Sequence, residues 1–330
     1  MLALSACGDS SVNWPVQELA GSTMGTTFSV KVVAPRADLD LASLQQDIQE
    51  TLDVINQTMS TYLDESELSH FNTSVNTDWV EVSAELCQAV EAAQIVSRFT
   101  DGAFDVTVGP LVNMWGFGPS ESVTTPPNDE QVAAALSDTG HTKLHTDCAV
   151  PALRKDSPGI YVDLSAFAKG HAVDRIADLL DERDLPNYLA EIGGEVRLRG
   201  LNGKGHNWAI AIETPDRTAR SVHTVVHLTN TGMATSGDYR NYFEYNGSHY
   251  SHTIDPRTGR PITHNGASVT VVADTAAFAD AAATALLVMG PEAGLALAER
   301  ESIAAYFLLR LESEFEERMS SLFAAEVLGR

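Results

Sequence analysis

Three side chains that carry acid, base or charge chemistry lie close together in the second half of the chain: His252, Asp255 and Arg257. They fall in residues 250–261, Tyr-Ser-His-Thr-Ile-Asp-Pro-Arg-Thr-Gly-Arg-Pro, where Pro and Gly are typical of a turn that follows a strand. An imidazole at a strand end can be aimed at a ligand, and its ordinary pKa of about 6.5 suits proton transfer near neutral pH. The same residues also form an ordinary turn, so the rest of the chain must decide between the two interpretations.

A second candidate is the pair Asp280 and Thr284, which are four residues apart and therefore share one face of a predicted helix. Most of the residues around them are alanines, which favours burial. A buried carboxylate and hydroxyl need a partner, and hard oxygen ligands of this kind suit Mg²⁺. We interpret the pair as a candidate metal site, with an exposed pair on a solvent face as the alternative.

Three glycine-containing segments could complete such a site. Residues 163–170, Asp-Leu-Ser-Ala-Phe-Ala-Lys-Gly, lead into a helix N-terminus, where free N–H groups and Lys169 would favour an anion. Residues 191–195, Glu-Ile-Gly-Gly-Glu, would let a flat ligand approach, and either glutamate could accept hydrogen bonds from a ring or a ribose. Residues 235–240, Thr-Ser-Gly-Asp-Tyr-Arg, add hydroxyls and an arginine in a predicted loop. A surface lysine and a simple hairpin turn are the alternatives for the first two segments.

Hydrophobic periodicity predicts the elements that must position these residues. Ser83 is predicted to cap a helix that ends at Asp101-Gly102, and Asn246-Gly247 to form a hairpin turn. Residues 103–127, rich in Gly, Pro and aromatic side chains, are predicted to form an irregular binding loop. Other helices are predicted over 41–59, 129–136, 167–183 and 275–289, after Pro291 and from Glu312. Strands are predicted over 26–33, 141–145, 160–163, 188–192, 195–199, 208–213, 221–228, 239–245, 249–254, 268–273 and 303–309. This order predicts an α+β fold in which helices cover a largely antiparallel sheet.

The chain has 330 residues and a formal net charge of −24, from 21 basic and 45 acidic residues. Its length suits one elaborate domain or two lobes. Such a charge repels phosphate backbones and anionic lipid surfaces, so we expect no nucleic acid partner. A phosphate-bearing ligand would need a local positive device, such as a metal ion, a helix N-terminus or a few placed Lys and Arg residues.

The three cysteines fall into two groups. Residues 4–7, Leu-Ser-Ala-Cys, have the shape of a bacterial lipobox in which Cys7 is lipidated, although the apolar segment before it is short; a chance cysteine is the alternative. Cys87 falls on an apolar helix face and Cys148 between short strands, and sequence leaves open whether they pair. No stretch of about 18 consecutive apolar residues predicts a membrane span.

Taken in order, these motifs resemble the ApbE family of flavin transferases, the FAD:protein FMN transferases. The resemblance covers nearly the whole chain after Gly21 and runs through residues 21–26, 59–62, 102–105, 163–170, 193–195, 235–237, 252–259 and 280–284. It implies an α+β, T-fold-related architecture of two lobes with a ligand cleft between them. Residues 21–330 would form this single domain, after a lipoprotein segment and linker over residues 1–20.

The resemblance also implies a role for individual residues. Asp280 and Thr284 would hold Mg²⁺, or Mn²⁺, together with backbone oxygen from Ala166 and Ala283. Residues that would bind FAD are Met24, Ser60, Tyr62, Asp105, Lys169, Gly193, Gly194, Ser236 and Gly237. Ser165 stands where the family's Asp-Leu-Gly-Ala pattern has glycine.

The implied reaction is Mg²⁺-dependent transfer of FMN from FAD to a Thr or Ser hydroxyl of a target protein, with release of AMP. His252 would accept the hydroxyl proton, and Asp255 would orient it or take the proton itself; Arg257 is interpreted as a structural turn residue. The implied acceptor carries a Ser/Thr-Gly-Ala-Thr/Ser motif in a membrane respiratory subunit, so we expect a periplasmic lipoprotein anchored to a bacterial membrane. An FAD pyrophosphatase and a non-catalytic flavin-binding protein remain as alternatives.

Overall fold

An antiparallel sheet of eight strands forms the centre of the protein, whose computed structural model describes residues 13–33, 39–119, 123, 125–216, 220–239, 241–312 and 314–330. From one edge to the other the strands are β1 (Val16–Thr23), β2 (Thr26–Val33), β6 (Tyr188–Ile192), β7 (Glu195–Arg199), β10 (Thr231–Gly237), β15 (Gly266–Ala273), β16 (Ala304–Arg310) and β17 (Phe315–Met319). Every neighbouring pair is antiparallel. The predicted α+β class with a largely antiparallel sheet is confirmed.

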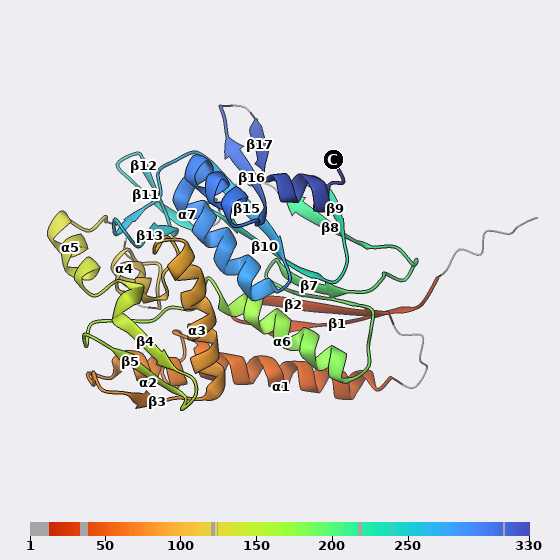
Figure 1. Ribbon diagram of the computed structural model, residues 1–330, viewed down its shortest axis with the longest axis horizontal. Helices are drawn as coiled ribbons and strands as arrows, with labels where there is room; N and C mark the ends of the chain where they lie inside the picture. The colour runs from red at the N-terminus through yellow and green to blue at the C-terminus, as the bar shows by residue number, and fades with distance from the viewer. Residues whose placement is uncertain are drawn as a thin grey trace, which may run out of the picture.

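Helices cover one face of this sheet and a hairpin covers the other (Figure 1). The helical layer consists of α1 (Leu41–Met59), α6 (Ala168–Glu182) and α7 (Ala276–Arg300). The opposite layer consists of β8 (Trp208–Glu213), β9 (Val222–Leu228) and the C-terminal turn at Phe323–Val327. Side chains alternate between the layers, so Phe307 packs with α7 while its neighbour Tyr306 packs with Phe323.

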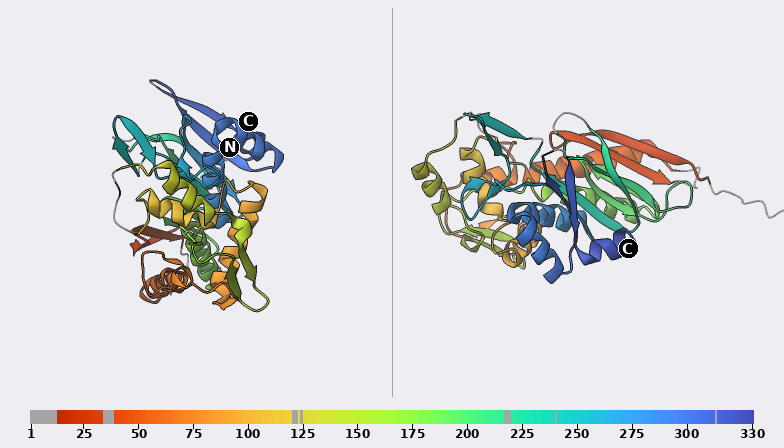
Figure 2. Two further views of the ribbon diagram at one scale, coloured as in Figure 1. Left: turned by 90° about the vertical axis from the view of Figure 1, so that its left-hand side faces the viewer. Right: turned by 90° about the horizontal axis from the view of Figure 1, so that it is seen from above.

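The other elements gather at one end of the long axis (Figure 2). They are α2 (Glu67–Thr73), α3 (Ala84–Phe99), α4 (Gly109–Met114), α5 (Asp129–Ser137), the short 3₁₀ turns Val106–Val108 and His141–Lys143, and the strands β3 (Val80–Glu81), β4 (Leu144–Asp147), β5 (Ala152–Lys155), β11 (Tyr242–Tyr245), β12 (Ser248–Ser251), β13 (Ile254–Asp255) and β14 (Arg260–Pro261). We call α4, α5 and the hairpins β11–β12 and β13–β14 the cap region. It has a small core of its own, made of Leu111, Trp115, Val132 and Ile254.

α6 and α7 cross in close contact, and this crossing positions the candidate metal residues on α7. A Cβ at Gly170 would lie 2.3 Å from the carbonyl oxygen of Ala276, so the crossing requires glycine. Asp174, on the next turn of α6, accepts hydrogen bonds at 2.9 Å from the N–H groups of both Ala276 and Ala277 and thereby caps the start of α7. Asp280 lies one turn further along α7 and is therefore held against α6.

Most of the predicted helices and hairpins are confirmed. The Ser83 side chain caps α3 by accepting a hydrogen bond from the N–H of Leu86. Asn246 and Gly247, with φ angles of 49° and 77°, make the tight turn between β11 and β12. Gly290, with φ 79°, kinks α7 where a break was expected before Pro291.

Strand β10 is the most consequential omission, because residues 235–240 are predicted as a loop. Its sequence, Thr-Gly-Met-Ala-Thr-Ser-Gly, lacks the bulky apolar residues that signal a strand. Small residues are required there since α7 packs directly on the strand: a Cβ at Gly232 would lie 2.4 Å from the backbone nitrogen of Ala276. The contact with α7, which is distant in sequence, thus determines the small-residue composition of β10.

The predicted strand over 160–163 is wrong. The segment has no strand partner there; instead the Asn72 side chain donates to the carbonyl of Val162 at 2.8 Å and accepts from its N–H at 2.7 Å, which imitates a strand neighbour. The predicted strand over 141–145 is partly wrong, because a 3₁₀ turn precedes β4. Asn72 itself belongs to α2, which the sequence did not reveal.

The helix predicted from Glu312 to the end is partly wrong, since only a short helical segment at Phe323–Val327 follows a strand there. Residues Phe315–Met319 form β17, whose Phe-Glu-Glu-Arg-Met sequence suits a helix in isolation but pairs with β16 at the edge of the sheet. At the other end, β1 begins at Val16 and pairs with β2, so it lies partly inside the 1–20 segment assigned to a linker. Both β1 and β17 are edge strands formed by pairing with a neighbour, and hydrophobic periodicity alone does not predict such pairing.

Cys87 and Cys148 form a disulfide that joins α3 to the turn between β4 and β5. The question that the sequence left open is answered by this pairing. The two cysteines are separated by 61 positions, so the bond closes a long loop of the unfolded chain.

Replacing both Cys87 and Cys148 by Ala is expected to lower the free energy of unfolding by about 2–5 kcal/mol, because the unfolded chain regains the entropy of the open loop. Urea unfolding followed by circular dichroism measures the change. A reductant should shift the midpoint of the wild type in the same direction and leave that of the double variant unchanged. Equal midpoints for the wild type with and without reductant would contradict the prediction.

Among the described residues, α7 is the one helix long and apolar enough to cross a membrane. Of its most apolar window, 67% is buried inside the protein. It packs against β10, β15 and α6, and it is kinked at Gly290. Burial in the core accounts for its composition.

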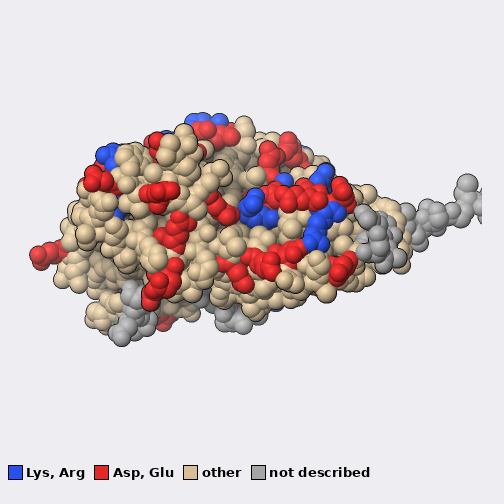
Figure 3. Space-filling model, turned by 90° about the horizontal axis from the view of Figure 1, so that it is seen from below, with Lys and Arg blue, Asp and Glu red and all other residues tan. Residues whose placement is uncertain are grey.

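Acidic side chains are spread over the face seen from below, with Lys and Arg in smaller, separate patches among them (Figure 3). This distribution agrees with the net charge of −24. A polyanion such as nucleic acid would meet repulsion on this face.

Candidate functional site

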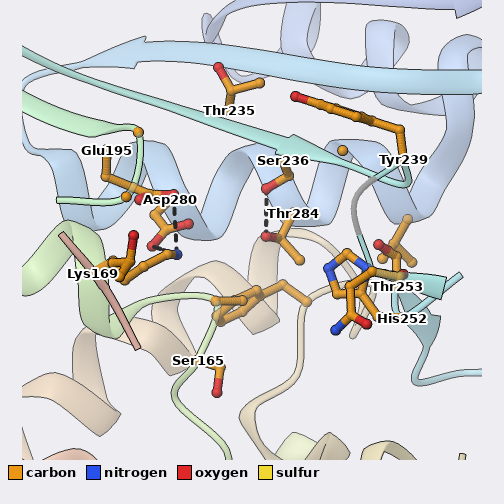
Figure 4. Close-up of a pocket in the computed structure, with 18 of the residues that line it drawn as sticks. Ser165, Lys169, Glu195, Thr235, Ser236, Tyr239, His252, Thr253, Asp280 and Thr284 are labelled. Carbon is orange, nitrogen blue, oxygen red and sulfur yellow. Dashed lines mark hydrogen bonds and ion pairs between the residues drawn. The ribbon is translucent and has the colours of Figure 1, made fainter. Parts of the chain in front are cut away.

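A cavity of about 750 Å³ opens between the cap region and the helix-covered sheet. That volume is typical of sites for small molecules and cofactors. The predicted site residues that line it are Tyr62, Asp105, Ala166, Lys169, Gly193, Gly194, Ser236, Gly237, His252, Asp280 and Thr284. Figure 4 shows three groups across the cavity: Lys169 with Glu195 and Asp280, then Ser236 with Thr284, then His252.

A buried charged group forms one end of the cavity. The Lys169 ammonium lies 3.1 Å from Oε1 of Glu195 and 3.6 Å from Oδ2 of Asp280. The same Oδ2 accepts a hydrogen bond from the N–H of Gly170 at 3.2 Å, so the helix N-terminus predicted to bind an anion holds the Asp280 carboxylate. Both carboxylates are almost fully buried.

The pKa values of this group reflect its burial. Burial by itself would lower the pKa of Lys169, but the Asp280 and Glu195 carboxylates outweigh that effect and raise it. Burial raises the pKa of Glu195 to about 7, although Lys169 opposes the rise. One ammonium faces two acids, so the group holds an excess negative charge when both acids are ionised.

Asp280 and Thr284 provide oxygen atoms of the kind a hard cation needs. They lie one helical turn apart on α7, and both line the cavity. The Thr284 hydroxyl is within 2.8 Å of the Ser236 hydroxyl on β10, which fixes its position. Nowhere in the described ranges do three His, Cys, Asp or Glu side chains come together as a metal cluster. Because a carboxylate and a hydroxyl are hard oxygen donors, the pair fits Mg²⁺, which takes a few protein oxygens and completes its shell with water and phosphate, better than it fits zinc.

His252 lies on the cap side of the cavity. Its Nδ1 is 3.0 Å from the carbonyl oxygen of Asn241, and because a carbonyl can only accept, Nδ1 carries the hydrogen. The neutral ring therefore presents Nε2 as a proton acceptor. Burial lowers the pKa of His252, which keeps the ring neutral at lower pH than an exposed histidine.

Aromatic packing holds the short segment between β12 and β13 that carries His252. Trp115 stacks with Tyr250 at 5.6 Å between ring centroids and donates from Nε1 to the carbonyl of Gly259 at 2.8 Å. Phe117 meets the His252 ring edge-on at 6.3 Å. The core of the cap region therefore fixes the imidazole, whereas the core between α7 and the sheet fixes the oxygen pair.

Asp255 is placed differently from the prediction. Its carboxylate forms a two-point ion pair with Arg257, at 2.9 and 3.0 Å, and also accepts from the backbone N–H of that residue. His252 is instead oriented by Asn241, so the predicted role of Asp255 in orienting it is wrong. Arg257 is confirmed as a residue that stabilises the turn.

Three of the predicted FAD-binding residues make their main contacts within the protein. Met24 occupies the β1–β2 turn with φ 49° and packs on the hydrophobic cluster beneath α1 and α6. Ser60 ends α1, and its side chain accepts from the N–H of Tyr62, which lies exposed at the cavity rim. Asp105 lines the cavity, but both of its oxygens already accept hydrogen bonds, from Thr107 and from His141.

The predicted site residues that would act through their backbone also differ in whether they line the cavity. Gly193 and Gly194, with φ angles of 60° and 109°, form the β6–β7 hairpin turn and line the cavity, where the approach of a flat ligand stays a prediction. Ala166 lines the cavity just before α6. Ala283 is fully buried inside α7 and does not line the cavity, and its role as a metal ligand stays a prediction.

Sequence reasoning missed two residues that shape the site. Glu195 is noted only as a possible acceptor for a ring or ribose, yet it pairs with Lys169. Asn241 acts through its backbone carbonyl, which no side-chain pattern reveals. The double glycine before Glu195 is the signal that could have found the first, because it lets the β6–β7 turn reach the cavity.

Comparisons with known proteins agree with this geometry. The sequence model of the ApbE family matches residues 24–307. The chain is 45% identical over 305 residues to the FAD:protein FMN transferase of Vibrio cholerae serotype O1, covering 92% of this chain and 91% of that protein. It is 43% identical over 328 residues to the protein of the same name from Haemophilus influenzae, covering 98% and 94%.

Solved structures show the same likeness. The flavin transferase ApbE from Vibrio cholerae superposes with a TM-score of 0.87 at 43% identity, covering 94% of this chain and 98% of that one. The apo form of the flavinyl transferase ApbE from Pseudomonas stutzeri superposes with a TM-score of 0.87 at 38% identity, covering 94% and 96%.

Proposed function

Because the chain belongs to the ApbE family and is an FAD:protein FMN transferase, we propose that its cavity binds FAD beside a Mg²⁺ ion and passes FMN to a Ser or Thr hydroxyl. One observation carries the proposal. The cavity presents the oxygen pair of Asp280 and Thr284 on α7, and His252 faces it from the cap region. Transfer of a phosphoryl-type group needs charge neutralisation at the diphosphate and a base for the attacking hydroxyl.

Asp280 and Thr284 would hold the Mg²⁺, with the carbonyl of Ala166 as a further donor on the same cavity wall. When bound, the ion supplies Lewis-acid stabilisation of the diphosphate. Lys169 adds a second positive charge at this end, and its raised pKa keeps it charged at neutral pH. With the ion bound, the group of Lys169, Glu195 and Asp280 would carry a net positive charge, which is the local positive device that an acidic protein needs to hold FAD.

The reaction forms a bond between the acceptor hydroxyl oxygen and the FMN phosphorus, and it breaks the bond from that phosphorus to the bridging oxygen. AMP leaves with the bridging oxygen and the electron pair. The hydroxyl proton passes to Nε2 of His252, which the Asn241 carbonyl keeps unprotonated by holding the hydrogen on Nδ1. The aromatic contacts of the cap region hold the ring in that orientation.

The transfer rate is expected to rise with pH along an acid limb whose midpoint lies below the ordinary histidine pKa of about 6.5. His252 accepts a proton only when it is neutral, and its neutral fraction grows as pH rises through its pKa. Because burial lowers that pKa, the limb moves to lower pH and the rate is on its plateau at neutrality. The kcat/KM for the acceptor, measured between about pH 5 and 8, reports the limb of the free enzyme. A midpoint above the ordinary value would contradict the assignment.

Incubation with FAD, Mg²⁺ and a protein bearing a Ser/Thr-Gly-Ala-Thr/Ser motif tests the function, with flavin fluorescence read on a denaturing gel. We expect fluorescence on the acceptor, and none when its motif hydroxyl is replaced by Ala. An FAD pyrophosphatase would instead release FMN and AMP without any acceptor. A flavin-binding protein without activity would leave FAD intact.

The location is proposed on separate grounds. The Cys87–Cys148 disulfide suits an oxidising compartment such as the bacterial periplasm. Cys7, in the lipobox-like residues 4–7, would carry a lipid anchor; it lies outside the described residues. An anchored periplasmic enzyme would face acceptors such as membrane respiratory subunits. Cell fractionation of the wild type and Cys7→Ala tests this, since only the wild type should sediment with membranes.

A further inference from the structure

The Asp280 carboxylate already has a cation beside it, and that cation is part of the chain. Oδ2 of Asp280 lies 3.6 Å from the Lys169 ammonium and accepts a hydrogen bond from the N–H of Gly170. A divalent ion on Asp280 would stand within a few ångströms of this ammonium. Two cations so close in a buried site repel strongly, because little water screens them.

The Glu195 carboxylate is an alternative ion-pair partner for the Lys169 ammonium. Glu195 lies closer to Lys169 than Asp280 does, at 3.1 Å, and it makes this contact through Oε1 alone. Its other oxygen, Oε2, is buried and has no hydrogen-bond partner within the described part of the chain. Glu195 could therefore bind the ammonium through Oε2 as well as Oε1.

The position of Glu195 is rigid while that of Lys169 is adjustable. Glu195 is the first residue of β7 and pairs with Ile192 across the β6–β7 turn, so its backbone is fixed by the sheet. Lys169 reaches the group on a flexible four-carbon side chain from the first turn of α6. A small rotation of that chain would transfer the ammonium from Asp280 to Glu195.

We propose that Lys169 is the resident cation of Asp280 in the metal-free protein, and that Glu195 is the positioning residue that takes over its ammonium when a divalent ion binds Asp280. This inference rests on the proposed function, because it assumes a metal at Asp280. Lys169 then opposes metal binding and Glu195 supports it. Substitutions at the two residues should therefore change metal affinity in opposite directions.

Isothermal titration with Mn²⁺ alone, without FAD, tests the inference on the whole chain. Lys169→Met is expected to bind Mn²⁺ about tenfold more tightly than wild type, since the competing charge is gone. Glu195→Gln is expected to bind about tenfold more weakly, since Lys169 then remains on Asp280. Glu195→Asp, which keeps the charge, should return most of the wild-type affinity. Lys31→Met, on the β1–β2 ribbon, controls for the loss of one positive charge elsewhere.

The melting temperature gives a second measurement if Lys169→Met folds poorly. Mn²⁺ should raise the melting temperature of that variant more than that of the wild type, because the ion replaces the lost cation. If the wild type binds Mn²⁺ and Lys169→Met binds it no more tightly, the inference is wrong and the metal assignment stands. If neither protein binds Mn²⁺, the metal assignment of the proposed function fails, and the inference fails with it.

Discussion

His252→Ala is expected to lower the rate of FMN transfer by about 10²–10⁴-fold, the usual contribution of a positioned general base. The expectation rests on the Asn241 carbonyl, which holds the hydrogen on Nδ1 and leaves Nε2 to accept a proton. The substitution removes no group from the Lys169–Glu195–Asp280 end of the cavity. Affinity for FAD should therefore stay close to that of the wild type, and the loss should be in the rate at saturating substrate.

Two companion variants make this result specific. His249→Ala removes a histidine from β12, three positions before His252 and away from the cavity lining, and should keep most of the activity. Asp255→Asn should also keep most of it, because that carboxylate is paired with Arg257. Full transfer activity in His252→Ala would overturn the assignment of the base. A loss in Asp255→Asn as large as that in His252→Ala would restore the rejected role of Asp255.

Asp280→Asn is expected to abolish detectable metal binding and to lower the transfer rate by about 10²–10³-fold, since a metal supplies several kcal/mol to such a reaction. The side chain keeps its shape, and an amide oxygen can still accept from the N–H of Gly170. The fold at the α6–α7 crossing should therefore survive. Titration with Mn²⁺ measures binding, and the in-gel fluorescence of the acceptor measures transfer.

Thr284→Val is the matched change on the next turn of α7. It removes a neutral oxygen and the contact with Ser236, so its effect on metal affinity should have the same direction but a smaller size. Circular dichroism spectra of both variants should overlay that of the wild type. Unaltered Mn²⁺ affinity in Asp280→Asn would show that the metal, if one binds, is held elsewhere.

Much of the site could be predicted from the sequence because its residues are tied to local signals. Asp280 and Thr284 share a helix face by spacing alone, and the alanines around them predict burial. Gly193-Gly194 signals a turn, and the structure places it at the cavity. The resemblance is specific because eight segments match the family in the same order, whereas each motif alone is common.

The remainder depends on contacts between distant segments. β10 is made of small residues because α7 lies on it, and Gly232 is readable as a strand residue only once that contact is known. The segment around Val162 is held by a side-chain amide of Asn72, which is 90 positions away. His252 takes its orientation from the Asn241 backbone, so the sequence pointed to the neighbouring Asp255 instead.

The stoichiometry of the products gives the most direct test of the proposed transfer. Wild-type protein, FAD, Mg²⁺ and an equimolar acceptor are incubated together, and intact-mass spectrometry of the acceptor is paired with quantification of AMP. We expect each acceptor to gain one FMN for every AMP released, with the modification on the motif hydroxyl. Release of AMP with free FMN and an unmodified acceptor would contradict the account.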